Sequence, residues 1–480
     1  MKLLKNTKLH KILLILLIPI LFWFGSKSSF ISEENTDELQ EPAVSTIPII
    51  NVYDNSQDPH HFNLADGSVF FEIRFLRTML LTPNGDLWGW GDNISGALGD
   101  SSMIDRFAPV LIMQNVAHMS GSNSHAIAVT TDGRLYSWGT NRVGQLGIGV
   151  YNNIVPRVDT PTFVMDNIRW AKTSDEYTIA ITTDNYLYTW GYNPHGQLGD
   201  GTTTVRNSPT RIMGDVYRAK AYRVTAHDGI FGHATFAIDT NNNLWGWGFN
   251  EYGHLGLGTY ENIYEPIIIK QGVIQIFPVQ EDRVVTSWIR ALTEDYGLYS
   301  WGVNSWGQVG DGTTIDRSIP FRMLENVRFA DERSAITHDN YLYTWGRNDF
   351  GQLGDGTFEH RPYPLRIMSN IAYTNNRGAI TTDNILYVWG HNHLGQLGDT
   401  TTENNPNPIR FMENIHYVGS GFNRTFAVTN DGSLWVWGNG PLGQLGTGQP
   451  EIVTSPRRIF LNPYFDQNSI DIVEGVPWLH

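Results

Sequence analysis

Short stretches in which apolar residues alternate with polar or small ones recur along most of the chain, and each stretch stops at a turn signal. In one of them, residues 126–131 alternate as a strand, Asp132 and Gly133 give the turn signal, and residues 135–138 resume the alternation. Period-two alternation on both sides of an Asp-Gly or Asn-Gly pair is typical of a β-hairpin. We therefore predict tight two-residue hairpins in which both turn residues adopt positive φ, because these residue types tolerate it.

The same hairpin is repeated eight times, and a tryptophan followed directly by glycine marks every copy. A turn residue lies six positions before each of these tryptophans, and a glycine lies six positions after it. Proline follows at the nineteenth position in seven copies, and in the second copy Pro161 fits only if four residues are inserted. Regularity with a period near fifty residues predicts a repeat architecture. The marker residues are Trp90, Trp138, Trp190, Trp247, Trp301, Trp345, Trp389 and Trp437.

Each repeat continues from the hairpin into a loop and a further strand. The loop reads Asn-x-x-Gly-Gln-Leu-Gly, and its glycines suit a compact segment with unusual backbone dihedrals. Proline then opens the next strand, where a missing N–H donor is tolerated at the first position. The tryptophan is the expected filler between sheets, since its side chain buries on the order of 200 Å². Each repeat is therefore expected to form a three- or four-stranded antiparallel sheet.

Eight such sheets without helices between them favour an all-β fold, a β-propeller of seven or eight blades. The phrase Leu-Tyr-x-Trp-Gly-x-Asn-x-x-Gly-Gln-Leu-Gly stands nearly intact at residues 187–199, 342–354 and 386–398. On these residues the chain resembles the regulator of chromosome condensation repeat family, and the resemblance covers about four-fifths of the chain. It implies a propeller, usually of seven blades, that is closed by strands from both termini.

The resemblance implies less about function than about fold. Members of this family include a nucleotide-exchange factor for a nuclear GTPase that binds chromatin, ultraviolet photoreceptors built on tryptophan clusters, and a secreted bacterial inhibitor of β-lactamase. A shared fold does not decide among such activities. The repeats match those of the family, whereas no exchange-factor residue is identified at any position of this sequence.

The first 25 residues have the features of an export signal. Four lysines and no acidic residue precede or flank an apolar run at residues 12–24, which is interrupted only by Pro19. The run is short for a membrane span and has the length of the apolar region of a signal peptide. Residues 1–25 are therefore predicted to be a signal peptide or, if uncleaved, a signal-anchor helix that places the chain in a membrane. A buried N-terminal helix of a cytosolic protein is the alternative interpretation.

Charge and composition divide the rest of the chain. Residues 26–68 contain five closely spaced acidic groups and no sustained period, which predicts an acidic stem. The repeats then occupy residues 69–463, and residues 464–480 form a C-terminal tail. Residues 31–480 carry 28 basic and 48 acidic groups, a balance of -20, and such a surface repels nucleic acid. The absence of cysteine excludes disulfides and thiolate chemistry and favours an exported bacterial protein.

Several residues resemble fragments of chemical sites. His391 and His393 form a His-x-His pair without an apparent third ligand, which we interpret as a loop coincidence. Gly-Asp-Gly-Thr runs at Gly199, Gly310 and Gly354 lack the alternating ligands of a calcium loop and are interpreted as turns. No nucleophile elbow or phosphate-binding loop is present. We therefore expect no catalytic residue, cofactor or metal, although a carboxylate pair for glycan cleavage is neither identified nor excluded.

Two variable positions between the loop Asn and Gly carry more information. Their second members in repeats four to seven are all apolar, and acidic residues stand beside two of them. If equivalent loops share one face, these side chains form an apolar arc of the kind that binds proteins. The alternative is that they tuck between blades. The candidate partner-binding residues are Glu251, Tyr252, Trp306, Asp349, Phe350 and Leu394.

Two long connections lie in the same sector, near residues 219–233 and 272–283, and are expected to project as enlarged loops or hairpins. The alternative is that they are tolerated insertions without a role. Together these features predict a monomeric, non-catalytic propeller, displayed on or secreted from a bacterial cell, that binds a protein or a cell-wall polymer. Two other functions stay open, namely an exchange-factor-like regulator of a GTPase and a glycan-acting enzyme on a propeller scaffold.

Overall fold

A computed structural model of the chain describes residues 70–73, 77–82, 84–151, 154–225, 231–280, 287–331, 333–375, 377–421, 423–431 and 433–459. At residues 70–73, 225, 278–280 and 287 it describes the backbone alone. The predicted signal or anchor, the acidic stem and the tail, at residues 1–25, 26–68 and 464–480, lie outside the described residues. In the described part every regular element is a β-strand, and no helix suited to crossing a membrane is found there.

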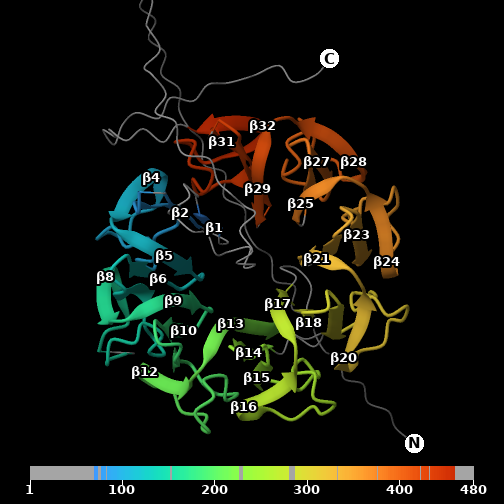
Figure 1. Cartoon of the computed structure of the whole chain (residues 1–480). Helices are drawn as coiled ribbons and strands as arrows, with labels where there is room; N and C mark the ends of the chain where they lie inside the picture. The colour runs from blue at the N-terminus through green and yellow to red at the C-terminus, as the bar shows by residue number, and fades with distance from the viewer. Residues whose placement is uncertain are drawn as a thin grey trace, which may run out of the picture. The chain divides into compact units, whose positions relative to one another are not determined.

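The strands form eight sheets, or blades, of four antiparallel strands each (Figure 1). Blade 1 contains β1 (Phe70–Ile73), β2 (Arg77–Leu81), β3 (Leu87–Gly91) and β4 (Arg106–Met113). Blade 2 contains β5 (Val116–Gly121), β6 (His125–Thr130), β7 (Leu135–Thr140) and β8 (Arg157–Met165). Blade 3 contains β9 (Ile168–Thr173), β10 (Tyr177–Thr182), β11 (Leu187–Gly191) and β12 (Arg206–Met213). Blade 4 contains β13 (Val216–Thr225), β14 (Phe231–Asp239), β15 (Leu244–Gly248) and β16 (Ile263–Lys270).

Blade 5 contains β17 (Val273–Gln280), β18 (Ser287–Thr293), β19 (Leu298–Gly302) and β20 (Arg317–Leu324). Blade 6 contains β21 (Val327–Ala330), β22 (Ser334–Thr337), β23 (Leu342–Gly346) and β24 (Arg361–Met368). Blade 7 contains β25 (Ile371–Asn375), β26 (Gly378–Thr381), β27 (Leu386–Gly390) and β28 (Asn405–Met412). Blade 8 contains β29 (Ile415–Gly421), β30 (Arg424–Thr429), β31 (Leu434–Gly440) and β32 (Glu451–Ile459).

The first strand of each blade is innermost in the ring and the fourth is outermost (Figure 1). The predicted β-propeller is confirmed, and its eight blades equal the number of sequence repeats. The expectation that strands from both termini share one blade is wrong, because blade 1 is β1–β4 and blade 8 is β29–β32. The ring closes instead through contacts between these two blades, including a 2.9 Å hydrogen bond from Trp90 Nε1 to the main-chain oxygen of Gln444.

Sequence repeats and blades are out of step by half a unit. A repeat begins at the turn between the second and third strands of one blade, as at Asp132 between β6 and β7. It therefore supplies the outer two strands of that blade and the inner two strands of the next. Each of the first seven repeats thus connects two neighbouring blades covalently, whereas the described part of the eighth lies in blade 8 alone.

The hairpin turns differ from the predicted two-residue type. Gly133 has a φ of 80°, whereas Asp132 is not among the residues with positive φ. The Gly133 N–H donates to Thr130 O at 2.9 Å, and the Thr130 N–H donates to Arg134 O at 2.9 Å. Three residues thus connect the paired positions, as in a type I turn followed by one left-handed residue. Asn185, Asn242, Tyr296, Asn340 and Asn384 occupy the left-handed position elsewhere.

The marker tryptophans fill the space between consecutive blades, as predicted. All eight are buried, and each indole N–H donates to a main-chain oxygen in the loop of the preceding blade. The acceptors, in order from Trp90 to Trp437, are Gln444, Ala97, Gln145, Gln197, His254, Gln308, Gln352 and Gln396, at 2.8–3.1 Å. We call this contact the tryptophan latch. It explains the last loop glycine, since a Cβ on Gly354 would lie 2.9 Å from Trp389 Nε1.

A buried asparagine organises each regular loop between the third and fourth strands. Asn348 Oδ1 accepts from the Leu353 N–H at 2.9 Å, and Asn348 Nδ2 donates to Asp355 Oδ1 at 3.1 Å. Asp355 also accepts from the Thr357 N–H and hydroxyl and from Arg361 Nε at 2.7 Å. The same side-chain pattern recurs at Asp200 and Asp311. These Gly-Asp-Gly-Thr segments are turns held by their own carboxylates, as the sequence predicted.

The repeat proline lies inside the outermost strand rather than at its start. Pro364 is the fourth residue of β24, where the pairing with β23 shifts register between Thr344 and Gly346. An edge strand tolerates a missing donor because one side of it faces solvent. In blade 2, Thr162 pairs with Ser137 as Leu365 pairs with Thr344, so that Pro161 corresponds to Pro364. The predicted four-residue insertion is thereby confirmed.

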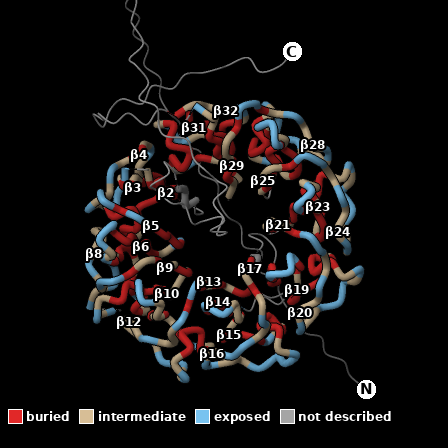
Figure 2. Tube along the Cα trace, in the orientation of Figure 1, coloured by how far each residue is buried: buried red, intermediate tan, exposed pale blue. Residues whose placement is uncertain are grey.

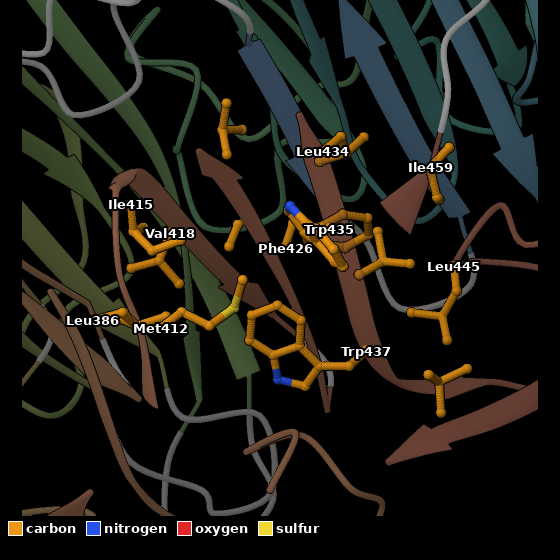
Figure 3. Close-up of a cluster of buried hydrophobic side chains, with 14 of the residues drawn as sticks. Leu386, Met412, Ile415, Val418, Phe426, Leu434, Trp435, Trp437, Leu445 and Ile459 are labelled. Atoms are coloured by element: carbon orange, nitrogen blue, oxygen red, sulfur yellow. The ribbon is translucent and has the colours of Figure 1, made fainter. Parts of the chain in front are cut away.

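Buried residues lie mainly between the blades, and exposed residues follow the outer strands and loops (Figure 2). Each blade packs both faces against its neighbours, so the second strands β6 and β10 are buried along their whole length. Figure 3 shows one such cluster, in which Leu386 and Met412 of blade 7 pack with Phe426 and Trp437 of blade 8. The cluster extends to Trp90 of blade 1, across the point where the ring closes.

The long connections of blades 4 and 5 extend their inner hairpins, which is one of the two forms expected for them. β13 has 10 residues and β17 has 8, whereas the equivalent β21 has 4. Extra residues near positions 219–225 and 272–280 are therefore paired strand. The hairpin tips, residues 226–230 and 281–286, lie outside the described residues.

Candidate functional site

The loops that contain the variable positions share one face of the ring. In a blade of four antiparallel strands, the connection between the first and second strands and the connection between the third and fourth lie at the same end. We call this side the motif-loop face. The lengthened inner hairpins of blades 4 and 5 extend toward the same face, beside the loops that carry Tyr252 and Trp306.

Arg347 of blade 6 connects three of the predicted residues. Its guanidinium carbon lies 5.0 Å from the ring centroid of Trp306 in blade 5 and 5.7 Å from that of Phe350 in its own loop. Its Nε donates to the Asp349 carboxylate. A guanidinium at these distances from aromatic rings is attracted by their negative faces. Trp306, Asp349 and Phe350 are therefore held together by one cation, and we call these four residues the Arg347 cluster.

The cluster continues into blade 7 through two histidines. The Phe350 ring centroid lies 4.6 Å from that of His391 and 6.0 Å from that of His393. Gln396 Nε2 donates to His391 Nδ1 at 2.6 Å, which fixes the orientation of this ring. The His-x-His pair therefore packs against Phe350, and His393 is the exposed member.

A third histidine orients the carboxylate of the cluster. The Asn348 N–H donates to His360 Nδ1 at 3.0 Å, so the ring proton of neutral His360 is assigned to Nε2. That nitrogen lies 3.5 Å from Asp349 Oδ1. Asp349 is thus placed between Arg347 and His360, at the solvent-facing side of the loop.

The other predicted residues lie outside this group. Tyr252 is half-buried on the core between blades 4 and 5, with its ring 6.1 Å from Phe249 and 6.0 Å from His254. Glu251 beside it is exposed. Leu394 is half-buried and donates its N–H to Gln396 Oε1 at 2.8 Å. Trp306 and Phe350 are half-buried too, so they both contact a neighbouring blade and present a surface to solvent.

Sequence reasoning missed the residues that contact the variable positions. The residue two positions after a marker tryptophan touches the second variable residue of the preceding blade. This contact is made by Phe249 with His195 at 5.1 Å, by Arg347 with Trp306, and by His391 with Phe350. In the sequence, these contacting residues are visible as an aromatic, basic or histidine residue directly after Trp-Gly. Only the packing of one blade against the next shows that this residue meets the second variable residue of the preceding blade.

The Arg347 cluster has the chemistry of recognition. It offers two half-buried aromatic surfaces and an arginine, residue types that are enriched where proteins bind one another, beside an exposed carboxylate. Among the described residues, no group of three or more His, Asp or Glu side chains is arranged to hold a metal ion.

Comparison with known sequences identifies the repeat. The family described as the regulator of chromosome condensation (RCC1) repeat matches residues 84–129, 132–181, 184–229, 241–279, 297–333, 339–373, 383–428 and 431–473. A second description of the same repeat matches residues 116–145 and 415–444. The ultraviolet-B receptor UVR8 of Arabidopsis thaliana is 33% identical over 253 residues, which cover 51% of this chain and 54% of the receptor. The chain spans about half, or less, of the length of the curated relatives it matches.

Solved structures share the fold at low sequence identity. The chain is similar to yeast RCC1 (Prp20), determined bound to Kap60, with a TM-score of 0.50, 17% identity, and coverage of 89% of this chain and 93% of that one. It is also similar to human WBSCR16, with a TM-score of 0.51, 18% identity, and coverage of 78% and 95%. These similarities support the propeller architecture. They do not determine the function, which depends on the arrangement of the loops.

Proposed function

Because the chain belongs to the regulator of chromosome condensation (RCC1) repeat family, we propose that it is a non-catalytic propeller that binds a protein partner through the motif-loop face of blades 5 to 7. The Arg347 cluster is the single observation that carries this proposal. Trp306 and Phe350 present rigid aromatic surfaces, and the surrounding charges fix their positions before a partner arrives. Tryptophan and arginine at the centre of an interface commonly account for most of its binding energy.

Similarity to other propellers supports binding as the role. The yeast relative is bound to Kap60 in its solved structure, an interaction that belongs to that protein. For this chain we propose only the same general role, that of a scaffold whose loops contact another protein. The Arg347 cluster suits a partner segment with an apolar side chain next to a polar or charged one, because aromatic rings, Arg347 and Asp349 adjoin one another.

We further propose that the propeller acts outside a bacterial cell, on its surface or in the medium. Residues 1–25 would direct export or anchor the chain through residues 12–24, and the acidic stem at 26–68 would separate the propeller from the membrane. The partner would then be a surface protein or a cell-wall polymer. A C-terminally tagged full chain, expressed in a bacterial host, is expected to be cleaved by protease added outside intact cells. Recovery of a protease-resistant cytosolic product with Met1 intact would contradict export.

The binding proposal is tested by capture from the host surface. Cross-linking on intact cells, followed by purification of the tagged chain and mass spectrometry, identifies the partner. Trp306→Ala combined with Phe350→Ala is expected to reduce its recovery about tenfold or more, as loss of interface hot spots does. Phe163→Ala is the matched control, because Phe163 is an exposed aromatic residue, 47% accessible, on the outer strand β8. Equal recovery with both variants would contradict the proposed site, provided that the melting temperatures agree.

A further inference from the structure

One side chain in the motif loop accepts a hydrogen bond from the main chain of the loop asparagine. This acceptor lies twelve residues after the asparagine and directly before the fourth strand of the blade. The bond is found in five of the described loops, at 2.8–3.0 Å. The acceptors, in blades 1, 4, 5, 6 and 7, are Asp105, Asn262, Asp316, His360 and Asn404. Blade 6 therefore has an imidazole nitrogen where the other four have a side-chain oxygen.

An imidazole nitrogen and a side-chain oxygen respond differently to acid. A neutral histidine keeps one ring nitrogen that accepts a hydrogen bond, whereas both nitrogens of an imidazolium ion are donors. Histidine gains its second proton in mildly acidic solution. Aspartate and asparagine keep an acceptor oxygen in every protonation state. Of these five loops, therefore, only that of blade 6 loses its acceptor on acidification.

The donor in this bond belongs to the residue that organises the loop. Asn348 is fully buried, its Oδ1 accepts from the Leu353 N–H at 2.9 Å, and its Nδ2 donates to Asp355 Oδ1 at 3.1 Å. A buried N–H without an acceptor costs about as much as a lost hydrogen bond. The side chain of His360 is 36% exposed, so protons reach it from solvent. Protonation of His360 therefore places two donors against each other, and no rotation of the ring restores the bond.

Asp349 connects this change to the Arg347 cluster. Its Oδ1 lies 3.5 Å from His360 Nε2, and its Oδ2 accepts from Arg347 Nε. A cationic His360 therefore competes with Arg347 for one carboxylate. Attraction between the imidazolium ion and the carboxylate favours protonation. It does not replace the acceptor that the Asn348 N–H loses.

Other charged groups on the elements next to this histidine are paired with one another. In its own blade, Arg361 Nε lies 2.7 Å from Asp355 Oδ2, and Arg361 Nη1 lies 3.3 Å from Glu359 Oε2. The blade 5 loop that bonds to the start of β24 contributes Asp311 and Arg317, which form an ion pair. Asp349 is therefore the carboxylate whose pairing changes most directly when the histidine becomes charged.

We propose that His360 is a positioning residue that makes binding at the Arg347 cluster depend on pH. This inference rests on the proposed function of the cluster and adds its regulation. With His360 neutral, the Asn348 N–H is bonded and Asp349 pairs with Arg347, so that Phe350 is held in place for a partner. With His360 protonated, the backbone at Asn348 moves and the carboxylate turns toward the imidazolium ion. Partner binding is thus favoured near neutral pH and weakened in mildly acidic solution.

Hydrogen exchange measured by mass spectrometry tests the hydrogen bond without any partner. In the full chain, the peptide that contains Asn348 is compared with the equivalent peptide around Asn392, whose acceptor is Asn404, at about pH 7.5 and 5.5. After correction for intrinsic exchange rates, protection in blade 6 is expected to fall about tenfold at the lower pH, because one hydrogen bond is lost. Protection in blade 7 is expected to stay unchanged. Equal changes in the two peptides, or no change in either, would overturn the inference.

Two variants assign the effect to one histidine. His360→Asn supplies the acceptor that blades 4 and 7 use, and is expected to keep the loop protected at both pH values. His338→Asn is the matched control, because His338 is an exposed histidine in the turn at the opposite end of blade 6, and it should behave as the wild type. In blade 7, His391 and His393 also lie near Phe350. A pH dependence that persists in His360→Asn would assign it to them and overturn the role of His360.

Capture of the partner separates this inference from the proposed function. Cross-linking at the same two pH values is expected to recover about tenfold less partner with the wild type at the lower pH, a coupling of ordinary size. His360→Asn is expected to recover equal amounts. Equal recovery by the wild type at both pH values would overturn the regulation and leave the proposed function intact. Recovery that is independent of Trp306 and Phe350 at both pH values would contradict the proposed function, and the regulation with it.

Discussion

Two positions in one loop, two residues apart, behave in opposite ways around the ring. At Gln352 the main-chain oxygen accepts the indole N–H of Trp389 at 3.0 Å, and every junction between blades has the same latch. At Phe350 the side chain differs from blade to blade and contacts whichever residue follows Trp-Gly in the next blade, here His391. The ring is therefore joined by the marker tryptophans and by main-chain oxygens that substitution of the loop residue leaves unchanged, while other side chains of the same loop are free to vary the surface.

The largest expected effect comes from removing a latch. Trp389→Ala deletes a buried indole and its hydrogen bond to Gln352, and is expected to lower the free energy of unfolding by about 3 to 5 kcal/mol. Trp306→Ala, at the variable position of blade 5, is expected to cost about 1 kcal/mol because the ring is half-buried. Urea denaturation followed by circular dichroism compares the two. Similar losses would show that the variable position also supports the ring.

Two glycines distinguish the steric effect of the latch on stability from the effect of backbone strain. Gly354 and Gly312 both have positive φ, at 71° and 83°, but only at Gly354 would a Cβ meet Trp389, whereas at Gly312 it would meet nothing within 4 Å. Gly312→Ala is expected to cost about 1 kcal/mol for the left-handed backbone alone, and Gly354→Ala roughly 2 to 4 kcal/mol because overpacking is added. Thermal unfolding of both variants measures the difference. Equal shifts would remove the steric explanation of the last loop glycine.

Stability should also depend on pH through a buried histidine outside the variable loop positions. His125, at the start of β6, is held by Ser122 Oγ at 3.0 Å and Thr178 Oγ1 at 2.8 Å. Burial, reinforced by the nearby Arg77 cation, lowers the pKa of His125 to about 3. The unfolded chain binds this proton near its ordinary value while the native protein does not. Stability is therefore lost as pH falls between about 6.5 and 3, by roughly 1.4 kcal/mol per pH unit.

His125→Gln isolates this contribution, because glutamine preserves hydrogen bonding without titrating. Denaturation of both proteins between about pH 7 and 4 should show a steeper loss for the wild type, the remaining carboxylates affecting both equally. Parallel curves would show that the pKa of His125 is the same in the native and the unfolded protein. The result bears on the comparison because Thr178, on β10 of blade 3, contacts His125 of blade 2 without being part of the tryptophan latch.

The smallest effect is the coupling within the Arg347 cluster. A double-mutant cycle of Trp306→Ala and Arg347→Ala is expected to give a coupling free energy of about 0.5 to 1 kcal/mol, as is usual for a partly exposed cation–π pair. Chemical denaturation of the four proteins measures it. A coupling near zero would mean that Arg347 is positioned by Asp349 alone, and the aromatic surfaces would then be arranged independently.

Spacing along the chain was enough to predict the propeller and the role of its tryptophans. A tryptophan at a fixed distance from a turn and a glycine requires the same local structure each time, so the pattern determines the blade. The exact turn type escaped prediction, because Asp132-Gly133 suits either a two-residue turn or a type I turn with one left-handed glycine. The position of Pro364 escaped as well, since the register shift beside it has no local signature.

The candidate site was predictable only in part. Trp306 and Phe350 could be selected because they interrupt the repeat, but Arg347 and His391 gain their importance from a contact across blades. The partners lie about forty residues apart, at 306 and 347 and at 350 and 391, which is close to one repeat.

The seam between blade 8 and blade 1 gives the ring a mechanical weak point. Among the described residues no strand crosses it, and its attachment there includes packed side chains and bonds such as those from Thr78 and Trp90 to the Gln444 oxygen. The chain enters the described ring at blade 1 and leaves it at blade 8, one on each side of the seam. Tension applied between the two ends therefore loads this junction first. Separation of blades 8 and 1 would convert the closed ring into an open arc, and each sheet would keep the hydrogen bonds between its own strands.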